Sequence, residues 1–182
     1  MKTKFVLAAI LVAFVTMGFD CINDPILVSL NLDPLSACYD INPGPNTSYQ
    51  GSVLIDPQDL IDDSYKDKIA DARVYNITVQ AQGPFAGGVT AGQVTINGIL
   101  LLTYSGTWAN FSTPQSLLGS SPYIHPQAAG IVELVLALKS RPLQQVTLAS
   151  TGSLTGGGVP PVPSGLSVCV NIYAQADANV KQ

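Results

Sequence analysis

The sequence predicts a mainly β protein, an antiparallel β-sandwich of about seven strands with two short helices as an α+β decoration. Three observations support this fold class. Short segments alternate apolar and polar residues from Ile26 onward, Asn97-Gly98 separates two such segments, and Pro and Gly clusters punctuate the chain. We expect a single β-sandwich domain over residues 21–182, preceded by a signal peptide over residues 1–20.

The clearest strand runs from Arg73 to Gln82. We expect Tyr75, Ile77, Val79 and Ala81 on its apolar face and Asn76, Thr78 and Gln80 on the other. Residues 99–102 are apolar on both faces, which is typical of a central strand covered on both sides. The other expected strands lie at residues 26–32, 35–41, 51–55, 93–96, 145–154 and 166–177.

Two helices are predicted. Asp56 can cap a helix that begins at Pro57, and Ile61, Tyr65 and Ile69 repeat at a spacing of four, which gives this helix one apolar face. Its other face is acidic and lacks the spacing of a calcium loop, so we interpret it as solvated. The second helix, over residues 126–139, is apolar nearly all round. We expect it to cover the central strand or to lie against a partner.

The N-terminus predicts export. Lys2 and Lys4 precede an apolar run from Phe5 to Met17, which is shorter than the roughly 20 residues that span a bilayer. Cys21 follows, at the position of the acylated cysteine in a bacterial lipoprotein. Gly18, Phe19 and Asp20 depart from the residues of a lipobox, so cleavage near Gly18 without lipidation is the alternative. A membrane contact is expected only through a lipid anchor at Cys21.

The three cysteines predict one disulfide. Cys38 and Cys169 each fall on the polar face of an alternating segment, and exposed free thiols are unfavourable outside the cell. We therefore predict a Cys38–Cys169 bridge that ties the first strands to the last. A local Cys21–Cys38 bridge that leaves Cys169 free is the alternative.

Charge is scarce, at 11% of residues against about a quarter in ordinary domains. The formal net charge is −4, and removing residues 1–20 makes it −5, which argues against a nucleic-acid partner. Between Val74 and Val168 the only charged residues are Glu133, Lys139 and Arg141.

Little in the sequence indicates catalysis. His125 is the only histidine, no Gly-x-Ser-x-Gly pattern occurs, and the acidic residues crowd into residues 56–71. One histidine and a bridged pair of cysteines do not make a zinc or copper site, and the glycine-rich stretches lack the Lys-Ser/Thr end of a phosphate loop. We therefore expect no metal, no cofactor and no enzyme activity.

The first functional hypothesis is an exported, non-enzymatic β-sandwich of the periplasm, the outer surface or the extracellular space. It would bind a protein partner or a surface, or self-associate, in a structural or adhesive role. The alternative is a module that binds carbohydrate or an apolar ligand through Trp108, Phe111 and Tyr123. A hydrolase that uses His125 is the remote alternative.

Overall fold

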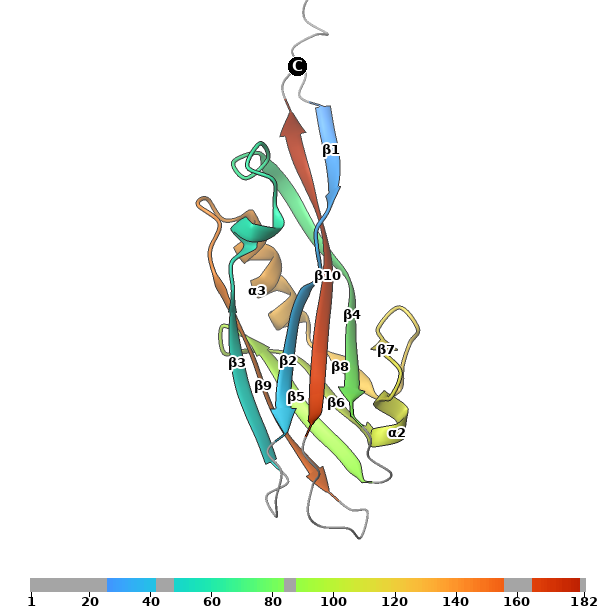
Figure 1. Ribbon diagram of the computed structural model, residues 1–182. Helices are drawn as coiled ribbons and strands as arrows, with labels where there is room; N and C mark the ends of the chain where they lie inside the picture. Colours follow the sequence, from blue (N-terminus) through green and yellow to red (C-terminus); the bar gives the residue numbers. More distant parts are fainter. Residues whose placement is uncertain (1–25, 42–47, 84–87, 156–164, 181–182) are drawn as a thin grey trace, which may run out of the picture.

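The computed structural model describes residues 26–41, 48–83, 88–155 and 165–180, and it confirms a mainly β, antiparallel, sandwich-like fold (Figure 1). The described residues form ten strands rather than about seven, because short strands also occur within the long connection over residues 106–126. In chain order the strands are β1 Ile26–Asn31, β2 Leu35–Ile41, β3 Ser48–Ile55, β4 Ile69–Gln82, β5 Val89–Ile96, β6 Ile99–Thr107, β7 Gln115–Ser116, β8 Ile124–Pro126, β9 Val146–Thr155 and β10 Leu166–Val180. The helices are the 3₁₀ turn η1 Pro57–Leu60, α2 Trp108–Phe111 and α3 Ala128–Lys139.

The first sheet is organised around β10. Its strand order is β1-β10-β4-β7, and β2 also pairs with β10. β1 pairs with the second half of β10 and β2 with the first half, so the two strands follow one edge in succession. Alternate residues of β10 face inward and are fully buried, as the predicted period of two requires. These are Leu166, Val168, Val170, Ile172, Ala174, Ala176 and Ala178.

The second sheet has the strand order β3-β9-β5-β6-β8. The predicted hairpin at Asn97-Gly98 is confirmed, and it joins β5 to β6. Asn97 and Gly98 both have positive φ, at 50° and 82°, as a two-residue turn between right-twisted strands demands. The core lies between the two sheets and includes Val94, Ile96, Leu102 and Leu148, all buried.

Helix α3 closes one side of the sandwich, where it contacts β4 and β6 (Figure 1). This confirms the expectation that the helix covers the apolar strand. The helix buries Leu134 and Leu138 and exposes Val132 and Leu136 by 55% and 57%, so it is covered on one face only. A salt bridge of 2.9 Å from Lys139 to Asp71 fixes its C-terminal end against the start of β4.

The predicted helix after Asp56 is wrong beyond its first turn. The Asp56 carboxylate does cap it, accepting from the backbone N–H of Gln58 at 2.9 Å, but the helix ends at Leu60. Turns follow, and Ile69 already belongs to β4. Ile61, Tyr65 and Ile69 reach the core from turns and a strand rather than from one helical face.

Tyr75 does not lie on the face of β4 that the alternation predicts. Ile77, Val79 and Ala81 are buried as expected, whereas Tyr75 is 44% exposed. The register against β10 shifts there, since Asn76 pairs with Tyr173 and Val74 with Ala174. This β-bulge leaves Tyr75 as the extra residue and turns its side chain outward.

The closest approach of helix to sheet lies at Gly130. A Cβ atom on this residue would meet the Leu101 Cα atom and lie 2.5 Å from Leu100 O. In the interior of a helix, alanine is normally more stable than glycine by about 1 kcal/mol. Here we expect Gly130→Ala to lower the free energy of unfolding by about 1–3 kcal/mol, because backbone atoms cannot move aside.

Urea unfolding followed by circular dichroism measures this change. The exposed neighbour Ala129→Gly serves as the control and should cost about 1 kcal/mol through helix propensity alone. Stabilisation by Gly130→Ala would contradict the close packing of α3 on β6.

Candidate binding surfaces

The polar side chains of β4 are engaged inside the fold. Asn76 accepts from the Ser116 hydroxyl at 2.9 Å, and Gln80 donates to the Ser112 carbonyl at 3.3 Å. Thr78 is buried and accepts from the Asn171 amide. The polar face of β4 therefore anchors residues 112–118 to the first sheet.

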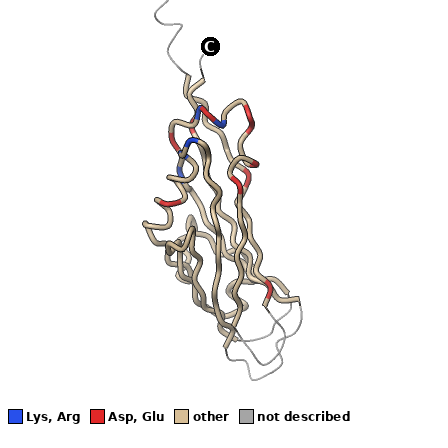
Figure 2. The backbone as a smooth tube through the Cα atoms, turned by 90° about the vertical axis from the view of Figure 1, so that its left-hand side faces the viewer, with Lys and Arg blue, Asp and Glu red and all other residues tan. Residues whose placement is uncertain are grey.

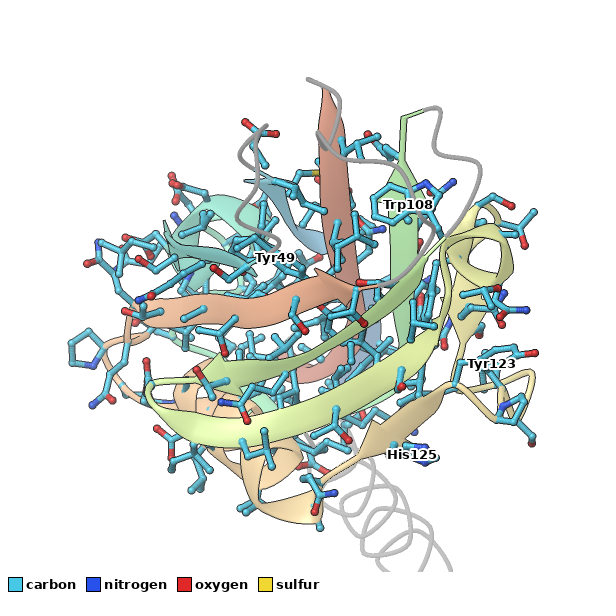
Figure 3. The ribbon with its side chains drawn as sticks, turned by 90° about the horizontal axis from the view of Figure 1, so that it is seen from below. Tyr49, Trp108, Tyr123 and His125 are labelled. Atoms are coloured by element: carbon cyan, nitrogen blue, oxygen red, sulfur yellow. A yellow bond between two sulfur atoms is a disulfide. The ribbon has the colours of Figure 1, made fainter. Side chains whose placement is uncertain are left out.

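The predicted ligand-binding aromatics lie at the end of the sandwich shown in Figure 3. Thr107 caps α2 in a capping box with Asn110, which directs Trp108 and Phe111 inward. Trp108 is 2% exposed and donates to the Gly83 carbonyl, and Phe111 is fully buried. Neither ring is available to stack on a ligand.

Tyr123 is half-buried and packs beside Phe111, with the ring centroids 6.0 Å apart. Its hydroxyl accepts from the Asn110 amide at 3.1 Å. His125 lies on β8, exposed and opposite Thr103 (Figure 3). Its backbone pairs with β6, and within the described ranges its imidazole ring takes part in no hydrogen bond and no ion pair.

A row of two tyrosines and two glycines crosses the second sheet. Tyr49 pairs with Gly152, Gly152 with Gly92 and Gly92 with Tyr104, on four adjacent strands. The two tyrosine hydroxyls hydrogen-bond to each other over the glycines. A Cβ on Gly92 would lie 2.5 Å from the Tyr104 hydroxyl, so both glycines are required by the rings.

A third buried tyrosine links the two sheets. Tyr39 of β2 donates to the Leu148 carbonyl of β9 at 3.0 Å. Burial raises the pKa of Tyr39, Tyr49 and Tyr104, which keeps all three hydroxyls protonated. These neutral, hydrogen-bonded groups stabilise the core and fix the register of the strands.

The outer side of the second sheet is free of charge. Its five strands contain no Asp, Glu, Lys or Arg, and His125 is the only titratable group that they turn outward. We call the outward-facing side chains of these strands the uncharged face. A shallow hollow of about 460 Å³ lies above the glycine row. It is lined by Ala91, Gly92, Gln93, Thr103, Thr151, Gly152 and Ser153.

Sequence reasoning missed this surface. Thr151 and Gln93 lie directly opposite each other on β9 and β5, although 58 positions separate them in the chain. Each strand alone shows only an ordinary alternation with Thr, Ser and Gln. The scarcity of charged residues from Val74 to Val168 was the one signal in the sequence. The pairing of the strands brings several of these uncharged segments together in one sheet.

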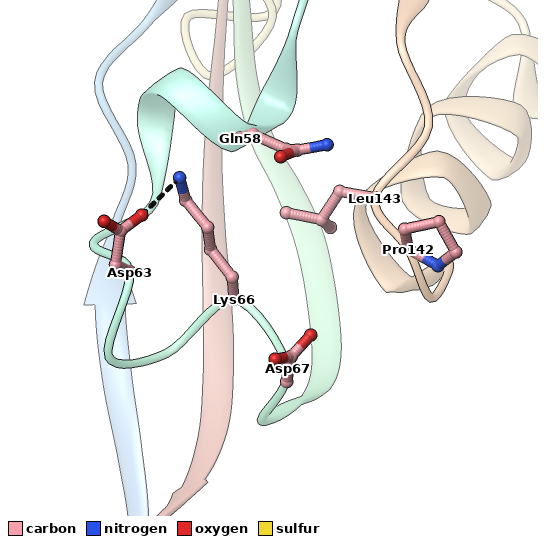
Figure 4. A pocket seen from close by; sticks show the side chains of 6 residues that line it. All are labelled: Gln58, Asp63, Lys66, Asp67, Pro142 and Leu143. Atoms are coloured by element: carbon pink, nitrogen blue, oxygen red, sulfur yellow. Dashed lines mark ion pairs between the residues drawn. The ribbon is translucent and has the colours of Figure 1, made fainter.

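Most of the charged residues in the described ranges gather at the end of the molecule where β10 ends (Figure 2). A cleft of about 340 Å³ lies there between the turns after η1 and the start of the α3–β9 connection (Figure 4). Lys66 bridges to Asp63 across 2.6 Å. Hydrogen bonds from Gln145 to Asp56 and from Ser64 to Asp62 lower the pKa of both carboxyl groups. These carboxylates therefore serve as caps and ion-pair partners.

An aromatic pair, formed by exposed Tyr75 and half-buried Tyr173, marks the outer side of the first sheet. The bulge residue Tyr75 lies beside Tyr173 of β10, with ring centroids 6.1 Å apart and planes tilted by 45°. Arg73 donates from Nε to the Gln175 side chain at 2.9 Å nearby. The position of Tyr75 depends on the bulge, which no periodicity reveals.

The predicted Cys38–Cys169 disulfide is present, between residues that are directly opposite on β2 and β10. Cys38 is exposed as expected, but Cys169 is 2% exposed, because β10 lies between β2 and β4. The bridge is consistent with an oxidising compartment. Because Cys38 is bonded to Cys169, the alternative Cys21–Cys38 pairing is wrong. Cys21 itself and the predicted signal segment lie outside the described ranges.

Within the described residues, no group of three or more His, Cys, Asp or Glu side chains is placed to hold a metal ion. No helix in that part of the chain is both long and apolar enough to cross a membrane.

Comparison with known proteins is sparse. No family model and no curated protein matches the sequence. Among solved structures, a chain of Desmodium yellow mottle tymovirus is similar over 88% of this chain and 91% of that chain. The identity is 8% and the TM-score 0.31, so this similarity carries no argument about the function of the present chain.

The disulfide closes a chain separation of 131 residues. On the chain-entropy model a loop of this length stabilises the fold by about 5 kcal/mol. We expect the double variant Cys38→Ala/Cys169→Ala to lose about 2–5 kcal/mol of unfolding free energy in urea. Adding a reductant should then have no further effect on the double variant, whereas it should destabilise the wild type to the same extent. A wild type whose unfolding free energy is the same with and without reductant would contradict the bridge.

Proposed function

We propose that this chain is an exported, non-enzymatic β-sandwich that binds a partner protein or surface through its uncharged face. The observation that carries the proposal is the sheet of five strands without a single Asp, Glu, Lys or Arg. Ordinary protein surfaces are rich in Lys, Arg, Glu and Asp, whereas the cores of binding interfaces are depleted of most charges.

The chemistry of this face defines the kind of partner. Hydroxyl and amide groups of Thr103, Thr151 and Gln93 offer both donors and acceptors around the hollow. A partner surface that matches this face presents uncharged polar groups, since a charged group placed here has no counter-ion. It also presents a low ridge that fits the hollow. Binding of this kind is insensitive to salt.

The proposal includes export of the chain to an oxidising compartment. Cleavage after the segment over residues 1–20 releases a chain whose Cys38–Cys169 bridge suits the periplasm, the outer surface or the extracellular space. Where Cys21 is acylated, only four residues separate the anchor from β1. Such an anchor attaches near the charged end and leaves the sides of the sandwich accessible.

Site-specific photo-crosslinking in the native source tests this function. A benzophenone amino acid replaces Thr151 on the uncharged face, and the same replacement at exposed Asp59 on the charged end is the control. We expect one defined crosslinked product from position 151, unchanged in yield at high salt, and none from position 59. Equal products from both positions, or none from position 151, would refute partner binding through this face.

The pair of exposed Tyr75 and half-buried Tyr173 supports a second candidate, a carbohydrate-binding module. Two neighbouring rings on an outer sheet face, with Arg73 and Gln175 beside them, offer both stacking surfaces and hydrogen-bonding groups for a sugar chain. This site replaces the one predicted from Trp108 and Phe111, which are buried.

Affinity electrophoresis in gels that contain neutral polysaccharides tests this candidate. We expect Tyr75→Ala to weaken retardation at least tenfold, about 1.4 kcal/mol, through loss of stacking. Tyr123→Ala, at the half-buried aromatic outside this site, is the matched control and should bind as wild type. A wild-type chain that no polysaccharide retards would remove the candidate.

A further inference from the structure

β3 is an edge strand of the second sheet that lacks protection. It pairs with β9 from Ser48↔Ser153 to Ile55↔Val146 without a register shift, and within the described residues no strand pairs with its other side. About four of its eight residues therefore direct their N–H and C=O groups away from the sheet. Such a row is a template for another strand.

Natural sheet edges are usually protected by charge, proline, bulges or short length. The opposite edge of this sheet, β8, has three residues and ends in Pro126. The β1–β2 edge of the first sheet is interrupted by Asp33 and Pro34 and carries Asp40. β3 has none of these features, since its sequence is Ser-Tyr-Gln-Gly-Ser-Val-Leu-Ile.

Apolar side chains also remain uncovered at β3. Leu54 is 62% exposed on the outer side. Val53 and Ile55 point to the core side but are only partly buried, so the core is open to water at this edge. A strand added beside β3 covers both sides at once.

We infer that the β3 edge pairs with the β3 edge of a second copy of this chain, in antiparallel orientation about a two-fold axis. Side chains of one face must stay on that face, so residues of the same parity lie opposite each other. The axis then passes through Gly51 or Ser52. In both registers Ser52 lies opposite, or diagonally close to, its own counterpart.

Charge favours this partner. No acidic or basic side chain lies on β3, so identical edges meet without repulsion. Antiparallel pairing about this axis also turns the two charged ends of the molecules to opposite ends of the dimer (Figure 2). The two uncharged faces then lie side by side on one continuous sheet of ten strands. This inference concerns an edge and does not depend on what binds the uncharged face.

Sedimentation velocity of the mature, oxidised chain tests the inference over a concentration range of about 1 μM to 1 mM. One pair of edge strands buries less than the standard interface area, so a weak dimer is expected. Ser52→Lys should raise the dimer dissociation constant at least tenfold, because it sets two ammonium groups against each other. Thr151→Lys, on the same face but one strand inward, should leave the constant within about twofold.

Unfolding curves confirm that both Lys variants are folded. Hydrogen exchange supplies a second readout, and amide protection should rise with protein concentration in β3 but not in β8. A wild type that stays monomeric throughout the range would overturn the inference. Dissociation by Thr151→Lys with no effect of Ser52→Lys would also overturn it, since the copies would then meet face to face. Loss of the crosslink at position 151 would instead count against the proposed function alone.

Discussion

Strand β10 is the constraint on which the first sheet depends. β1, β2 and β4 all pair with this one strand, and the Cys38–Cys169 bridge joins it to β2. Its partners come from the first half of the chain, so the sheet closes only after the last strand is present. Contacts of this sequence separation make folding slow, because the chain entropy is lost before the contacts form. A covalent link between β2 and β10 lowers the entropy of the unfolded chain and offsets part of that cost.

The second sheet is built around a different constraint, the row Tyr49–Gly152–Gly92–Tyr104. Tyrosine rings reach the centre of the sheet from its flanking strands only because the two central strands carry no side chain at that level. The hydroxyl groups then satisfy each other in the core, where an unpaired hydroxyl would be costly. On the outer surface these glycine positions present only backbone, as every inward-facing strand position does. The hollow there is bounded by outward side chains such as Gln93, Thr103 and Thr151.

Strand positions and their buried faces were predictable because each depends on an alternation of period two within a few residues. The helix after Asp56 was not, because Ile61, Tyr65 and Ile69 satisfy a helical spacing but are also reached from turns that lead into β4. Tyr75 was placed on the wrong face because a bulge changes the alternation without any change of residue type. The candidate surfaces depend on which strands are neighbours. That order is set by contacts distant in sequence, so a single strand carries no sign of it.

The uncharged face and the bare β3 edge are two results of one distribution of charge. The charged residues lie mostly in the turns around η1, at the start of β4 and at the end of α3, where ion pairs and caps hold several of them (Figure 2). With this distribution the molecule keeps a net charge, although the second sheet contains no Asp, Glu, Lys or Arg. The edge strands of natural sheets usually carry charged side chains such as Lys or Glu, because uncharged edges pair with the strands of other chains. A chain that omits them from five adjacent strands gains nothing in solubility from the omission. Under the proposed function the omission favours binding, since a sheet without charge meets another uncharged surface without desolvating any ion.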